Sequence, residues 1–208
     1  MSEAVPEGSA STPAPVSGRR GVNLLVEFVL IVTGVLLALA VDEWREEAER
    51  DRLARQVLVN VAEELSESIA TIDGSVPYKE AMLPKLDRAL QAITTEGRWT
   101  FPPEGYEGIR DPELTVAAYE SALLTGVLPR LRADTVRSLA RVDQLREDMA
   151  RTNERQAQEL LQTDFSDGER YLRLVQLRFA DGLAQERRLR AAMAEALTRV
   201  EAEIAARD

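Results

Sequence analysis

The side chains that most often carry out chemistry are scarce in this 208-residue chain. It contains no cysteine and no histidine, and 36 Asp and Glu against 26 Lys and Arg give a net charge of -10. Cysteine nucleophiles, Ser-His-Asp triads, HExxH zinc sites and the Glu-x-x-His motifs of di-iron bundles are therefore excluded. An enzyme built on this sequence would have to rely on Asp and Glu.

The carboxylates form no recognisable reactive or metal-binding pattern. Glu63, Glu64 and Glu67 lie close in sequence, but their spacing matches no ligand motif, and acid-rich helix faces are common. No paired carboxylates stand in a glycosidase-like frame. We predict no catalytic residue, no cofactor, no metal site and no enzymatic activity. Because the arginines alternate with acids, we also predict no nucleic-acid binding.

One acidic residue stands within a long apolar stretch. Val22–Val41 is charged only at Glu27, and as a helix its 20 residues would measure about 30 Å, the thickness of a hydrocarbon core. Trp44 follows at the position expected for an interface anchor. The sequence predicts a transmembrane helix over residues 22–41, with the lipid bilayer as its partner.

A cleaved signal peptide is the alternative for the same stretch. Ala38-Leu39-Ala40 fits a small-x-small cleavage site. The apolar run is long for a signal peptide, has no polar segment before that site, and continues directly into a helical pattern. These features favour a retained anchor.

Glu27, Gly34 and Ala38 would share one face of this helix. Their spacings of seven and four residues place them within about 40° of one another. Gly34 and Ala38 form a small-xxx-small pattern, which lets helices approach closely. The sequence predicts a face that pairs with a second copy or with another membrane protein. The alternative is that Glu27 lies near the headgroups without a partner.

A short aromatic segment is a second candidate contact. Trp99, Phe101 and Tyr106 stand beside Pro102 and Pro103 in a predicted loop. Exposed aromatics of this kind can bind a partner protein. The alternative is that they cover the end of a helical bundle.

The elements that would position these residues are helical. Residues 1–21 are poor in large apolar residues and predict a disordered tail. Residues 42–208 predict an all-α soluble domain, an antiparallel bundle whose last two helices form a coiled-coil hairpin. Its first helix, the stalk at 42–73, continues from the transmembrane helix and ends at Gly74 and Pro77. Further helices are predicted at about 78–95, 112–125 (capped by Asp111), 134–162 and 169–206.

Apolar residues at three- and four-residue spacing mark the inward faces of these helices. They are Leu53, Val57, Val61, Leu65, Ile69 and Ile72; Met82, Leu83, Leu86, Leu90 and Ile93; Val136, Leu139, Val142, Leu145, Met149 and Leu160; and Leu172, Val175, Phe179, Leu183, Leu189, Met193, Leu197 and Ile204.

Two stretches resemble a bacterial family of uncharacterised single-pass membrane proteins. In the first, residues 27–44, the family's anchor pattern falls on Glu27, Gly34, Leu37, Ala38, Leu39, Asp42 and Trp44. The second, residues 118–139, is similar to a family segment with Tyr-Glu, a Gly and a Leu-rich link into a new helix. The resemblance implies an anchored helical protein and brings no catalytic residues with it.

Two observations bear on the orientation of the chain in the membrane, and they disagree. Only Arg19 and Arg20 precede the predicted span, and four arginines follow it at 45, 50, 52 and 55, a count that favours a cytoplasmic domain. The resemblance instead implies a cytoplasmic N-terminus and a periplasmic domain at the bacterial inner membrane. The predicted function is a membrane-anchored interaction or scaffold protein. The alternative is an extracytoplasmic sensor-like bundle that binds a small ligand.

Overall fold

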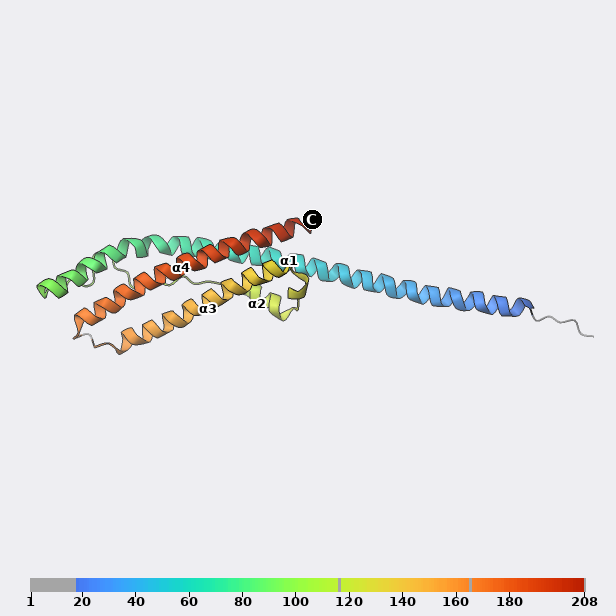
Figure 1. Ribbon diagram of the computed structural model, residues 1–208, viewed down its shortest axis with the longest axis horizontal. Helices are drawn as coiled ribbons and strands as arrows, with labels where there is room; N and C mark the ends of the chain where they lie inside the picture. Colours follow the sequence, from blue (N-terminus) through green and yellow to red (C-terminus); the bar gives the residue numbers. More distant parts are fainter. Residues whose placement is uncertain (1–17, 116, 165, 208) are drawn as a thin grey trace, which may run out of the picture. The chain divides into compact units, whose positions relative to one another are not determined.

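The described part of the computed structural model comprises residues 18–115, 117–164 and 166–207, with side chains from Val26 onward. Its elements are α1 (Gly18–Glu96), α2 (Ala117–Leu124), the 3-10 helix η1 (Leu128–Arg130), α3 (Ala133–Gln162) and α4 (Gly168–Ala205) (Figure 1). These ranges contain no strand, so the predicted all-α class is confirmed. The chain divides between Glu49 and Arg50 into two units, and the bundle belongs to the second.

Helix α1 is longer than the sequence predicts. It passes through Gly74, Pro77 and Pro84, so the predicted break at residues 74–77 and the separate helix at 78–95 are wrong. Both prolines lie on the exposed face, whereas Ile72 and Met82 are buried on the opposite one. Proline has no backbone N–H, so a hydrogen bond is missing on the outer face of the helix, and the helix can bend with that face convex. This part of α1 curves in Figure 1. Burial of several inward side chains, at about 1.5–3 kcal/mol each, outweighs the helix penalty of about 3 kcal/mol per proline.

Helix α4 runs antiparallel to both α1 and α3, as predicted for the last two helices (Figure 1). The contacts between each pair of helices agree, because residue numbers rise along one helix as they fall along the other. They are Asp73 with Arg190 and Asp87 with Gln176 between α1 and α4, and Asp134 with Arg199 and Gln156 with Asp181 between α3 and α4. The predicted helical bundle is therefore confirmed, with the first two predicted helices joined into one.

The apolar interior of the bundle consists of two clusters. The larger core contains Val61, Leu139 and Met193 with their neighbours, and the smaller core contains Leu172 and Phe179 with theirs. The predicted inward positions are buried or half-buried with one exception, Leu53, which is 45% exposed.

The helix ends beyond α1 agree with the sequence except at the start of α2. Helices α3 and α4 begin and end within one residue of prediction, and Gly126, with a φ of 67°, follows α2 as predicted. The predicted start at Asp111 is wrong, because α2 begins at Ala117. The Asp111 carboxylate binds Arg178 of α4, so it does not cap a local helix.

The first unit is described from Gly18 as helix and from Val26 with side chains. Every side chain from Val26 to Val41 is exposed. Among the described residues, no helix has both the length and the apolar character needed to cross a membrane. The side chains of Val22–Leu25, which belong to the predicted span, lie outside this description, as do residues 1–17 of the predicted tail.

We expect the fragment Arg50–Asp208 to fold alone, because both apolar cores are contributed by residues of this unit. Circular dichroism of the purified fragment should show a helical spectrum and one cooperative thermal transition. A gradual, non-cooperative loss of signal would contradict this.

Candidate functional site

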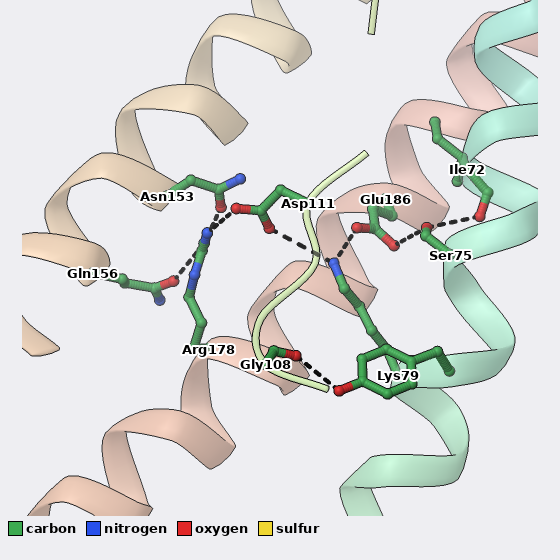
Figure 2. Close-up of polar contacts among 10 residues, drawn as sticks. Ile72, Ser75, Lys79, Gly108, Asp111, Asn153, Gln156, Arg178 and Glu186 are labelled. Atoms are coloured by element: carbon green, nitrogen blue, oxygen red, sulfur yellow. Dashed lines mark hydrogen bonds and ion pairs between the residues drawn. The ribbon is translucent and has the colours of Figure 1, made fainter. Parts of the chain in front are cut away.

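A layer of buried charge lies between the two apolar cores. Lys79 of α1 and Arg178 and Glu186 of α4 keep only 2%, 4% and 1% of their side chains exposed (Figure 2). Asp111, from the segment that joins α1 to α2, completes the group. We call these four residues the charged layer.

Lys79 joins α1 to α4. Its Nζ donates to Glu186 Oε1 and lies 3.8 Å from Asp111 Oδ1. The single Ser75 hydroxyl lies 2.9 Å from both Glu186 Oε2 and the carbonyl oxygen of Ile72, either of which can accept its proton (Figure 2). Both carboxylate oxygens of Glu186 therefore have a donor nearby.

Arg178 joins α4 to α3 and to the connecting segment. Its guanidinium donates to Asp111 and to Asn153, and Nη1 lies 3.1 Å from Gln156 Oε1 (Figure 2). Gln156 in turn donates to Asp181 at 2.8 Å. Burial lowers the pKa of Arg178, and the nearby carboxylates, Asp111 first among them, oppose that shift.

The connecting segment is held at a second point by Tyr78. The Tyr78 hydroxyl donates to the carbonyl oxygen of Gly108 at 2.8 Å and accepts from the N–H of Glu107 at 2.9 Å. Together with Asp111, these bonds hold the segment against α1 and α4.

The charged layer contains two cations and two carboxylates, so its formal charges compensate one another. Burial of such groups is tolerable only when they are paired and hydrogen-bonded. This arrangement joins three long helices and the connecting segment at one level of the bundle.

Two further glutamates bond to N–H groups at or beside the starts of other helices. Glu64 of α1 accepts from the N–H of Ala118 in α2 at 2.7 Å, and Glu203 of α4 accepts from the N–H of Arg132, beside the start of α3, at 3.0 Å. A carboxylate at this position satisfies free N–H groups and complements the helix dipole. Burial raises the pKa of Glu64, and its bond to Ala118 opposes the shift.

Among the predicted site residues, Glu27, Gly34, Ala38 and Trp44 are all exposed on α1. A methyl group added at Gly34 would meet no atom within 4 Å. Gly34 and Ala38 lie on an open, nearly flat strip of the helix surface with Leu37, Val41, Asp42 and Arg45. Pairing through this face stays a prediction.

The predicted aromatic loop packs against the smaller core. Phe101 contacts Trp99, Tyr106 and Tyr171, with ring centroids 5.7, 4.9 and 5.6 Å apart. Trp99 lies over Gly168, where a Cβ would come within 2.5 Å of the indole, and it remains 47% exposed. Binding of a partner by this loop stays a prediction.

Sequence reasoning missed the charged layer, although the sequence contains a signal for it. Lys79 falls between the inward positions Ile72 and Met82 of α1, and Glu186 falls between Leu183 and Leu189 of α4. Opposite charges at inward positions of two apolar stripes indicate a buried pair. Glu64 belongs to the acidic group at 63–67, for which the sequence predicts a solvated helix face. It is half-buried, whereas Glu63 and Glu67 are exposed.

We predict that Lys79→Met destabilises the bundle by about 3 kcal/mol, because it leaves the Glu186 carboxylate buried without its main cation. Adding Glu186→Leu should restore part of the loss, since Asp111 and Arg178 still compensate each other. Urea denaturation of Lys79→Met, Glu186→Leu and the double variant measures these free energies of unfolding. A double variant as unstable as the sum of the two single variants would rule out the coupling.

Glu64 gives a pH-dependent prediction. Because burial raises its pKa in the folded state, the ionised form weakens folding, and this cost is lost as pH falls from the raised folded-state pKa to below the unfolded-state pKa. Glu64→Gln keeps an oxygen acceptor for Ala118, so at pH 7 its melting temperature should equal or exceed that of the unmodified protein. Glu64→Ala loses the acceptor and should cost about 1 kcal/mol at pH 7. Equal melting of the Gln and Ala variants would contradict the capping role.

Comparisons of the chain with models of known protein families, with curated proteins and with solved structures found no match. Its function is therefore inferred from its own residues and geometry.

Proposed function

We propose that the chain is a membrane-anchored helical interaction protein in which residues 22–41 cross the bilayer and the bundle is presented at its surface. The observation that carries this proposal is the exposure of the stretch Phe28–Val41. It contains no charged residue, and its large side chains are exposed on all sides of the helix, from 38% at Val32 to 70% at Leu30.

The free energy cost of leaving these side chains in water supports the proposal that another apolar phase or molecule covers the stretch. Full burial of a large aliphatic or aromatic side chain contributes about 1.5–3 kcal/mol, and this stretch has ten such side chains exposed: Phe28, Val29, Leu30, Ile31, Val32, Val35, Leu36, Leu37, Leu39 and Val41. Even partial burial would be worth on the order of 10 kcal/mol, comparable with the net stability of a whole domain.

A bilayer fits this surface better than a single partner helix. A helix packed against one neighbour needs one apolar stripe, whereas a helix that is apolar all round is surrounded by apolar material. Together with residues 22–27 the stretch reaches 20 residues, or about 30 Å as a helix, which matches the hydrocarbon core. Trp44 then stands at the level of the headgroups.

Within the bilayer, the face with Glu27, Gly34 and Ala38 is the proposed contact with a second copy or another membrane protein. The small side chains at Gly34 and Ala38 let a neighbouring helix approach closely, and the Glu27 carboxyl group on the same side can hydrogen-bond with that helix. The resemblance of residues 27–44 to the anchored bacterial family supports a cytoplasmic N-terminus and a periplasmic bundle at an inner membrane.

We expect the double variant Glu27→Leu with Gly34→Ile to associate more weakly in membranes than the unmodified chain. Interhelical polar contacts in membranes contribute about 0.6 kcal/mol on average, and loss of the close approach at Gly34 adds to this, so the combined effect should exceed either single change. FRET between labelled copies in membranes measures association, and capture of co-expressed membrane proteins measures pairing with another protein.

Leu30→Ile is the matched control, because its side chain is exposed at 70% but points about 60° away from Glu27. Equal association and capture by the double variant and the control would mean that this face is not an interface. Release of the unmodified protein from membranes by an alkaline wash, or a mature N-terminus at Val41, would contradict the anchor itself.

A further inference from the structure

Helix α2 exposes apolar surface that the bundle does not use. Leu124 is 88% exposed and Leu123 is 49% exposed, and Glu120 is the only charged residue in the helix. Of its residues, only Ala122 is buried. A helix in water normally turns polar side chains outward, so this pattern is unusual for a solvated surface.

Three contacts place α2 and the following residues at the end of the bundle where the chain enters from the first unit. Glu64 of α1 binds the N–H of Ala118, and Arg130 pairs with Asp51 of α1 at 2.9 Å. Arg207, beyond the C-terminal end of α4, donates to the carbonyl oxygen of Arg130 at 2.5 Å. Asp51 follows Val41, the last residue of the apolar stretch, by only ten positions.

We propose that Leu123 and Leu124 insert into the interfacial region of the same bilayer that holds the anchor, so that this end of the bundle rests on the lipid surface. This inference depends on the proposed membrane anchor. It adds a second lipid contact, made by the soluble domain.

The shape of this site favours lipid over a protein partner. Leu123 and Leu124 end a helix of eight residues, and the tight turn at Thr125 and Gly126 follows at once, so the apolar surface is a small tip. A stable protein interface usually buries about 800 Å² on each partner, far more than two leucines offer. Insertion into lipid has no such minimum area, because each apolar side chain contributes separately.

The net charge of -10 explains why such a contact would need the anchor. An acidic protein is not attracted to anionic lipid, and a few inserted side chains give only weak, reversible binding. The anchor keeps the tip close to the membrane, so that its high effective concentration makes a weak contact sufficient.

The absence of natural cysteine allows a direct test on the full chain. Single variants Leu124→Cys, Leu36→Cys and Leu161→Cys are labelled with the same small fluorophore and placed, one chain per disc, in lipid nanodiscs with or without brominated acyl chains. Leu36 lies in the apolar stretch and reports the anchor. Leu161, at the C-terminal end of α3, is 85% exposed and is the matched control for Leu124.

We expect brominated lipid to reduce the emission of the probes at Leu36 and Leu124 and to leave the probe at Leu161 unchanged. Adding Leu123→Asp to the Leu124 probe should abolish its quenching without changing the circular dichroism melt, because Leu123 is half-exposed at a helix end. Quenching at Leu36 but not at Leu124 would overturn the docking inference alone. No quenching at Leu36 would overturn the anchor, and equal quenching at Leu124 and Leu161 would show that the label itself binds lipid.

Discussion

The pairing of Lys79 with Glu186 restricts how the long helices of this bundle can pack. Stripes of Ala, Leu and Val on α1, α3 and α4 are similar along their length and would tolerate sliding by a helical turn or two. A shift of α4 along α1 would leave Lys79, Glu186 and Arg178 buried opposite apolar side chains, which costs several kcal/mol for each unpaired charge. We infer that the charged layer contributes less to the free energy of unfolding than to the selection of one register between α1 and α4.

The same dependence on distant partners governs the short elements between α1 and α3. Helix α2 has only eight residues, too few to be stable alone, and the N–H of Ala118 in its first turn is bonded by Glu64 from α1. Two more carboxylates join elements far apart in the sequence. Glu203 of α4 accepts from the N–H of Arg132, and Asp111 of the connecting segment pairs with Arg178. The position of the exposed tip at Leu124 is thus set by the long helices, which makes it a fixed feature of the bundle.

Periodicity alone predicts most of the helices, and the errors have identifiable causes. α3 and α4 are correct within one residue because each has a continuous apolar stripe and a clear turn between them. Gly74 and Pro77 suggested a break because local propensity takes no account of a curved helix with the proline on its outer face. Asp111 has the local sequence of a helix cap, but in the structure its carboxylate pairs with Arg178 of α4 and no helix begins there. Lys79 and Glu186 have no role predicted from the sequence, because the partner of a charged residue becomes visible only in the folded chain.

The division of the apolar interior into two cores has a consequence for the motions of the bundle. Polar side chains separate the cores, so few apolar contacts continue from one to the other, and cooperative opening need not involve the whole bundle. We expect the smaller core, covered by the aromatic loop and the turn before α4, to open at the lower free energy, because fewer buried side chains hold it together. The larger core, beside the point where the chain enters, should stay closed during such local unfolding. Fluctuations would then be concentrated at the end of the bundle opposite α2.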